Sequence, residues 1–151
     1  MSHRTTAQWH EMNEPVIAEF RVRGGKVSRR WPVLLLTTMG AKTGKQRVTP
    51  LNFSIDADRI VVVASKGGAP AHPSWYRNLV ANPEVTVELG TETFQAHATT
   101  AEEPERTRLY DQHAAEMTFF DGYRKRVTTR QIPVVVFEGP PGAVRRALGG
   151  H

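Results

Sequence analysis

Cysteine is absent from the 151-residue sequence, which excludes disulfide bonds, thiolate metal ligands and a cysteine nucleophile. Long apolar runs are absent as well. No stretch approaches the ~20 residues of a membrane span, and residues 1–15 lack the apolar centre of a signal peptide. A hydrophobic fraction of 39% suits one globular domain over residues 1–151. We therefore expect a soluble, cytoplasmic, single-domain protein.

Familiar catalytic signatures are also missing. No two of the six histidines stand four residues apart, and none belongs to a metal-ligand motif, so no metal site is expected. The sequence contains no Gly-x-Ser-x-Gly motif and no obvious pair of general acid and base. If the chain is an enzyme, its reactive atoms are expected to belong to a cofactor.

What the chain does contain is a glycine- and lysine-rich segment, "TTMGAKTGKQRVTP", at residues 37–50. It is not a nucleotide-binding P-loop, because Gly44 and Lys45 are followed by Gln46 and the position five before Gly44 is Met39. The residues after it alternate like a strand and include Pro50, which would break a helix. The segment therefore predicts a loop between two strands.

Apolar residues at helical spacing predict three helices, at residues 6–23, 74–82 and 101–117. Ser74 and Thr100 are the expected N-caps of the second and third helices. Runs of apolar or alternating residues predict strands at 33–39, 47–55, 59–65, 84–90, 91–99 and 132–138. The apolar segment around residues 117–123 is too irregular to predict a simple helix.

Most of these strands follow one another through hairpins, which indicates an antiparallel sheet closed into a small barrel with helices outside it. The fold class is therefore α+β, mainly β. Residues 1–25 are interpreted as an N-terminal helix that can act as a lid, residues 30–138 as the barrel core, and residues 139–151 as a loose tail.

The formal net charge of +5 favours an anionic partner, whether nucleic acid, a membrane surface or a polyanionic small molecule, although an ordinary basic surface would also explain it. Four cations stand on two glycine-containing loops that a meander would bring to one end of the barrel: Lys42, Lys45, Arg47 and Lys66. Together with loop amides and a helix start, they predict an anion site. The alternative interpretation of "KTGK" is a solvated hairpin whose glycine serves turn geometry.

Three segments resemble the deazaflavin-dependent nitroreductase family, whose oxidoreductases use coenzyme F420: "LLLTTMGAKTGKQRVTPL", "VVVASKGGAPAHPSWYRNLVANPEVTVELG" and "RQIPVVVFE". The resemblance spans residues 14–138 and rests on the combination of TTxGxKTGxxR, ASKGG and WYxNLxANP. It implies a split β-barrel of the flavin-reductase and pyridoxamine-oxidase-like type. Family members commonly have GRKTG where this chain has Ala41, so one cationic contact is missing.

The resemblance implies a cofactor, F420, that carries a phosphodiester and an acidic oligoglutamate tail on a planar ring. The first loop would bind the phosphate and tail, while the second loop and the helix after it would face the ring. The cofactor-binding residues implied in this way are Lys42, Thr43, Lys45, Arg47, Thr49, Ala64, Ser65, Lys66, Gly67, Trp75, Tyr76 and Asn78. FMN, which similar barrels bind, is the alternative cofactor.

In the family, a hydride passes from the reduced deazaflavin to an acceptor. Ser65 and Tyr123 are the candidate catalytic residues, and Ser65 would hydrogen-bond the accepting group. The N-terminal helix, with Trp9 and Met12, is expected to close over the acceptor. The residues expected to bind the acceptor are Trp9, Met117, Phe119, Phe120 and Tyr123. The run between Tyr123 and Ile132 is one residue longer than is usual in the family.

The leading hypothesis is an F420H2-dependent reductase of small hydrophobic electrophiles such as quinones, nitroaromatics or activated enones. The alternative is a deazaflavin- or FMN-binding protein with little or no turnover. Nucleic-acid binding is not expected, because the cations gather on two loops instead of spreading over one face. A weak association with membrane surfaces stays open, and so does a homodimer, since an exposed barrel edge can pair with a second copy.

Overall fold

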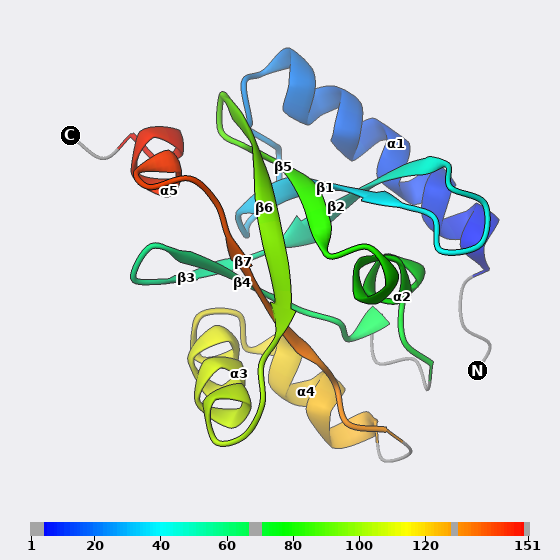
Figure 1. The fold of residues 1–151 in the computed structure, drawn as a ribbon, viewed down its shortest axis with the longest axis vertical. Helices are drawn as coiled ribbons and strands as arrows, with labels where there is room; N and C mark the ends of the chain where they lie inside the picture. The colour runs from blue at the N-terminus through cyan, green and yellow to red at the C-terminus, as the bar shows by residue number, and fades with distance from the viewer. Residues whose placement is uncertain (1–4, 67–70, 128–129, 150–151) are drawn as a thin grey trace.

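The strands form one curled antiparallel sheet in the computed structural model, which describes residues 5–66, 71–127 and 130–149 (Figure 1). Seven strands lie within these ranges: β1 (Val33–Met39), β2 (Gln46–Asn52), β3 (Ser54–Asp56), β4 (Arg59–Val63), β5 (Glu84–Leu89), β6 (Glu92–Thr100) and β7 (Val134–Glu138). Their order across the sheet is β2-β1-β5-β6-β7-β4-β3. The antiparallel sheet predicted from the sequence is confirmed.

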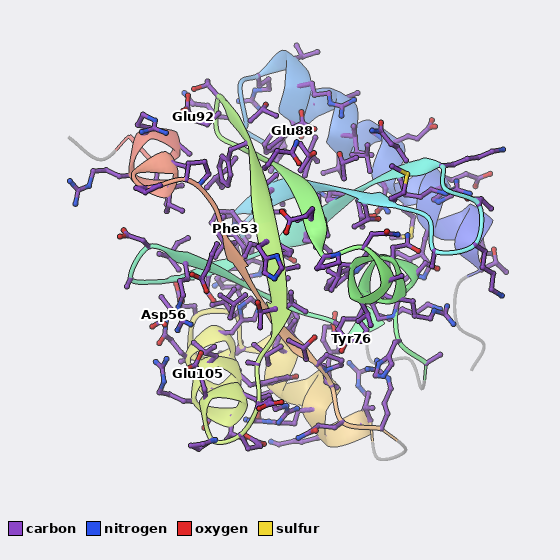
Figure 2. All side chains as sticks on the ribbon, in the orientation of Figure 1. Phe53, Asp56, Tyr76, Glu88, Glu92 and Glu105 are labelled. Carbon is purple, nitrogen blue, oxygen red and sulfur yellow. The ribbon has the colours of Figure 1, made fainter. Side chains whose placement is uncertain are left out.

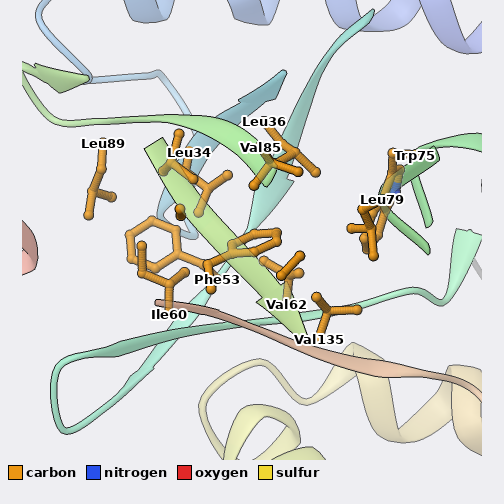
Figure 3. Packing of buried hydrophobic residues seen from close by; sticks show 14 of the residues in the cluster. Leu34, Leu36, Phe53, Ile60, Val62, Trp75, Leu79, Val85, Leu89 and Val135 are labelled. Atoms are coloured by element: carbon orange, nitrogen blue, oxygen red, sulfur yellow. The ribbon is translucent and has the colours of Figure 1, made fainter. Parts of the chain in front are cut away.

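The predicted strand at residues 47–55 is in fact two strands. β2 pairs with β1 at one edge of the sheet and β3 pairs with β4 at the other, although only Phe53 separates them in the chain. Asn52 ends one pairing and Ser54 begins the other, so the two edges approach each other here. Phe53 is 5% exposed and lies in the middle of the core between them (Figure 3). Its burial explains why the chain changes edge at this residue.

The central strands are buried on both faces of the sheet. On the inner face, Leu34 and Leu36 of β1 pack with Val62 of β4 and Val135 of β7 (Figure 3). On the outer face, β4 and β7 pack against a second apolar cluster that includes Leu109. Burial on both faces explains why β1 and β7 read as continuous apolar runs, as the sequence predicted.

Five helices surround the sheet within the described ranges: α1 (Thr6–Val22), α2 (Ser74–Ala81), α3 (Glu105–Glu116), α4 (Phe119–Arg126) and α5 (Ala143–Ala147). α3 and α4 lie together beside β4 and β7, while α1 runs along β2 at the other end of the molecule (Figure 1). Arg21 of α1 pairs with Glu88 of β5 at 2.9 Å (Figure 2). Among these helices, none combines the length and the apolar character needed to cross a bilayer.

Both predicted helix caps are wrong. α2 and α3 follow Pro73 and Pro104, and neither helix has a side-chain hydrogen bond at its cap. Thr100 instead ends β6, where it pairs with Val135 and its hydroxyl lies 3.1 Å from the hydroxyl of Tyr76. Thr100, which the sequence predicted to cap a helix, is therefore the last residue of a strand.

Two segments expected to be irregular are helical. α4 begins at Phe119, because the burial of Phe120 on the outer cluster stabilises a helix that Gly122 alone would disfavour. α5 contradicts the loose tail, since Ala143 and Val144 are buried. Gly90 allows this packing: it has a φ of +59°, and a Cβ there would lie 2.4 Å from the carbonyl oxygen of Ala147.

Candidate active site

A cavity of about 250 Å³ lies where α1, β2, the end of β4, the start of α2 and α4 meet. Its lining consists of Trp9, His10, Asn13, Thr49, Pro50, Leu51, Asn52, Val63, Ser65, Lys66, Pro73, Ser74, Trp75, Phe119, Phe120 and Tyr123. This described lining contains Lys66 and no carboxylate. The cavity is therefore suited to a neutral or anionic ligand with apolar surface.

One side of the cavity is an aromatic wall, formed by Phe119, Phe120 and Tyr123 of α4. The ring centroids of Phe119 and Phe120 are 4.6 Å apart, and the Tyr123 ring stands edge-on to Phe120 at 5.4 Å. Outside the wall, Trp31 packs on Phe119 at 6.0 Å. Such an array presents a broad apolar surface to a planar molecule.

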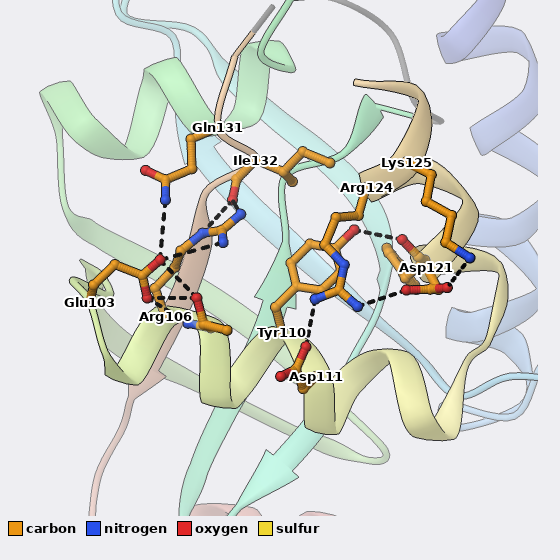
Figure 4. Close-up of polar contacts among 11 residues, drawn as sticks. Glu103, Arg106, Tyr110, Asp111, Asp121, Arg124, Lys125, Gln131 and Ile132 are labelled. Atoms are coloured by element: carbon orange, nitrogen blue, oxygen red, sulfur yellow. Dashed lines mark hydrogen bonds and ion pairs between the residues drawn. The ribbon is translucent and has the colours of Figure 1, made fainter. Parts of the chain in front are cut away.

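The aromatic wall is anchored to α3 by a polar network (Figure 4). The hydroxyl of Tyr110 donates to the carbonyl oxygen of Phe120 at 2.6 Å, and burial raises the pKa of Tyr110 to about 12, so it remains a donor at neutral pH. Arg124 lies 4.7 Å above the Tyr110 ring and pairs with Asp111 at 2.5 Å and Asp121 at 2.7 Å. These contacts fix the position of α4 on α3.

Beneath Phe120 lies His113, which is fully buried. Its ring centroid is 4.4 Å from that of Phe120, and its Nδ1 is 2.7 Å from the hydroxyl oxygen of Ser54. Nε2 of His113 has no hydrogen-bond partner among the described residues. Burial lowers the pKa of His113 to about 4, so the aromatic wall rests on a neutral imidazole.

The opposite side of the cavity is formed where the chain leaves β4. Ser65 is only 5% exposed, and Lys66 has a φ of +51°. The left-handed conformation costs an L-residue about 1–2 kcal/mol, and such strain persists where surrounding contacts hold it. Trp75 joins this side from α2 while packing into the inner core. This side of the cavity is therefore built into the fold.

The cationic hairpin, residues 40–47, lies beside the cavity without lining it. Gly40 donates to the carbonyl of Lys45 at 2.7 Å, and Gly44 adopts a φ of +70° at the turn. Lys42, Lys45 and Arg47 are exposed and make no ion pair in the part of the chain that the structure describes. Their charges are available to an anion.

Asn78 of α2 holds the cationic hairpin. Its Oδ1 accepts from the Ala41 amide at 3.0 Å and its Nδ2 donates to the Thr38 hydroxyl at 3.2 Å. Asn78 and Thr38 are both buried. The two loops that the sequence expected at one end of the barrel thus meet through α2, and the Asn78 side chain is committed to joining them.

The structure brings part of the predicted site together. The predicted residues that line the cavity are Trp9, Thr49, Ser65, Lys66, Trp75, Phe119, Phe120 and Tyr123. Those that lie elsewhere are Lys42, Thr43, Lys45, Arg47, Ala64, Tyr76, Asn78 and Met117. Met117 is 1% exposed and packs in the outer cluster, so it does not reach the cavity surface. Gly67 lies outside the described residues. The roles assigned to these residues stay predictions.

Several lining residues were missed from the sequence. Met12, expected in the lid, is 44% exposed, whereas His10 and Asn13 line the cavity. The spacing of Trp9 and Asn13, four residues apart on one helix face, was a signal that could have identified Asn13. The lining segment of β2, residues 50–52, carried no such signal, because its exposure to a cavity depends on how the sheet curls.

Comparison with known proteins agrees with this geometry. The family model for F420H(2)-dependent quinone reductase matches residues 12–139. The F420H(2)-dependent quinone reductase Rv1261c of Mycobacterium tuberculosis is 39% identical over 126 residues, which cover 79% of this chain and 84% of that protein.

Solved structures give the same result. An F420-H2 dependent reductase, FDR-A, is 38% identical with a TM-score of 0.65, covering 71% of this chain and 94% of its own. A Listeria innocua protein described as a pyridoxamine 5'-phosphate oxidase shares only the fold, with 11% identity, a TM-score of 0.50 and coverage of 85% and 93%. The split β-barrel implied by the resemblance is confirmed, and the chain belongs to the F420H(2)-dependent quinone reductase family.

Proposed function

We propose that this chain reduces quinones with F420H2 as the hydride donor, and that the cavity between the aromatic wall and the 64–66 segment is where the reaction occurs. The observation that carries the proposal is a cavity whose described lining holds no carboxylate, next to lysines and an arginine that make no ion pair among the described residues, in a chain of this family. The wider acceptor range, which would include nitroaromatics and activated enones, belongs to the proposal as well.

The residues present fit the cofactor in charge and size. A cavity of about 250 Å³ is smaller than the ~300–1,000 Å³ typical of sites for drug-sized ligands, so it can take the planar ring but not the whole molecule. The phosphodiester and acidic tail must then lie outside, where the cationic hairpin offers Lys42, Lys45 and Arg47. Charge-assisted contacts of this kind are among the stronger hydrogen bonds in proteins.

When bound, the reduced deazaflavin supplies a hydride, so the chain itself needs to align the acceptor and exclude water. The aromatic wall would stack the acceptor against the ring. Ser65 and Tyr123 would donate hydrogen bonds to the accepting oxygen. Reduction of the quinone to the quinol would take up the two electrons and the proton of that hydride, and the second proton would come from solvent.

An anaerobic assay tests this proposal. Purified protein is mixed with F420H2 and menadione, and reoxidation of the cofactor is followed by its absorbance, with FMN titrated separately. We expect tight binding of F420, weak binding of FMN and catalytic turnover of the quinone. Binding of F420 without turnover would instead support the cofactor-binding alternative. Preference for FMN would contradict the assignment of the cationic hairpin.

Two further expectations concern partners. The net charge of +5 supports weak association with anionic membrane surfaces, which cosedimentation with anionic vesicles would test. The edge strands β2 and β3 support a homodimer through strand pairing, which light scattering at several protein concentrations would test.

A further inference from the structure

Arg130 contacts the cavity wall from behind. Its Nη1 donates to the carbonyl oxygen of Ala64 at 3.1 Å, and its Nη2 donates to that of Ser65 at 2.8 Å. The same Nη1 lies 2.9 Å from Nδ1 of His72. One guanidinium therefore holds the segment that leaves β4 and also the residue two positions before α2.

The contact with His72 requires a neutral imidazole, because a protonated ring has no acceptor. Burial is the main cause that lowers the pKa of His72, and the neighbouring charges of Arg130 and Arg77 add to it. The His72 ring also stands edge-on to Tyr76 at 5.1 Å. At neutral pH, Nδ1 of His72 therefore accepts from Arg130 in a fixed orientation.

Peptide geometry gives these contacts a consequence inside the cavity. In a trans peptide the N–H points away from the preceding carbonyl. Arg130 donates hydrogen bonds to the carbonyls of Ala64 and Ser65, which share their peptide groups with the amides of Ser65 and Lys66. These two amides therefore point away from Arg130. Neither amide donates a backbone hydrogen bond among the described residues, and both residues line the cavity. The left-handed φ of Lys66 is the backbone state that these contacts hold.

We propose that Arg130 is a positioning residue: by holding the carbonyls of Ala64 and Ser65, it directs the amides of Ser65 and Lys66 into the cavity, where they donate to an oxygen of the bound cofactor ring. This inference rests on the proposed function, since it assigns the ring to the cavity. It explains why a partly buried arginine donates hydrogen bonds to two main-chain carbonyls directly before a strained lysine.

Arg106 offers a matched control. Its Nε and Nη2 donate to the carbonyl oxygen of Ile132 at 3.1 and 2.8 Å, only two residues from Arg130 (Figure 4). It therefore makes the same kind of contact, a guanidinium on a main-chain carbonyl. No contact of Arg106 reaches the 64–72 segment in the described residues. Loss of either arginine should destabilise the fold, but only loss of Arg130 should release the cavity amides.

The experiment compares Arg130→Lys and Arg130→Gln with Arg106→Lys and Arg106→Gln. Lysine keeps the charge but cannot span two carbonyls. Thermal melts, F420 affinity and the ¹H–¹⁵N shifts of the Ser65 and Lys66 amides are measured for each variant, with and without F420. We expect both Arg130 variants to bind F420 about tenfold more weakly or worse, because the charge-assisted hydrogen bonds that hold the two carbonyls are lost. We also expect both variants to lose the F420-induced shifts of the Ser65 and Lys66 amides.

The Arg106 variants should melt at lower temperature yet keep wild-type F420 affinity and both amide shifts. Wild-type affinity and shifts in Arg130→Lys would overturn the positioning role while leaving the proposed function intact. Equal loss of F420 affinity in the Arg106 variants would also overturn it, because general destabilisation would then explain the effect. Absence of F420 binding by the wild-type protein would overturn the proposed function and this inference together.

Discussion

The cationic hairpin and the aromatic wall flank the same cavity but are built in opposite ways. The hairpin is exposed, its cations make no ion pairs within the described chain, and the Ala41–Asn78 hydrogen bond joins it to α2. The side chains of the aromatic wall pack in the outer cluster, and contacts with Tyr110, Arg124 and His113 hold the wall in place. The hairpin therefore contributes charge at little cost to folding, whereas the wall contributes shape that the fold itself depends on.

This difference predicts separable effects of mutation. Changes in the aromatic wall should alter the free energy of unfolding first and ligand binding second. Changes in the cationic hairpin should alter ligand binding and leave the free energy of unfolding nearly unchanged.

The largest expected effect is that of Phe120→Ala. Phe120 is 5% exposed and packs on His113, so its truncation should lower the free energy of unfolding by about 3–5 kcal/mol. Urea denaturation of the cofactor-free protein measures this. Phe119→Ala is the control, because Phe119 is only partly buried and should cost less. Equal stability of the two variants would mean that the aromatic wall is not part of the core.

His113 should make stability depend on acidity. Its pKa rises from about 4 in the folded state to 6.5 in the unfolded chain, so the unfolded state takes up the proton first. Its contribution is fully present above pH 6.5 and is lost as the pH falls from 6.5 to 4, by roughly 3 kcal/mol in all. Denaturation curves measured at several pH values across this range should show that the free energy of unfolding falls more steeply with falling pH in the wild type than in His113→Gln. The same pH dependence of the free energy of unfolding in both proteins would show that His113 is not buried as a neutral group.

The cationic hairpin should give the converse result. Lys42→Ala and Arg47→Ala should each weaken F420 binding by about 1.5–3 kcal/mol while the melting temperature stays unchanged. Titrations at low and high salt should show that the affinity of the wild type for F420 falls with salt and that the affinity of the variants falls less steeply. Lys26→Ala, a change of the same charge away from both loops, is the control. Unchanged affinity in both hairpin variants would refute the assignment of the hairpin to the cofactor.

The smallest expected effect is at Asn78, the residue that joins the two regions. Asn78→Ala leaves the Ala41 amide and the Thr38 hydroxyl without their partner, so it should cost roughly 1–2 kcal/mol in stability. It should also weaken F420 binding without changing the salt dependence, because no charge is lost. Asn82→Ala, at the exposed end of α2, serves as the control. A changed salt slope in Asn78→Ala would indicate direct contact with the ligand.

The sequence predicted the elements whose signals are local. β1 and β7 were identified by continuous apolar runs, and the β5–β6 hairpin by alternation around Gly90. The crossover at Phe53 was missed, because an aromatic residue in an alternating strand does not reveal that its two neighbours pair with opposite edges of the sheet. α4 was missed because packing on α3 outweighs Gly122.

The candidate site divides in the same way. The lysines of the cationic hairpin and the aromatic residues of α4 could be identified from residue type and spacing. Arg130 could not, because its partners are main-chain carbonyls some 65 residues away in sequence, and carbonyls leave no mark in a sequence. Asn78 was assigned to the cofactor from the resemblance, whereas its observed partners are Thr38 and Ala41.

A crystal structure of the complex with F420 tests the central claim most directly. The account predicts the planar ring inside the cavity, between the amides of Ser65 and Lys66 and the aromatic wall, with the acidic tail along Lys42, Lys45 and Arg47. A ring bound outside this cavity, or a tail that leaves the cationic hairpin untouched, would contradict it.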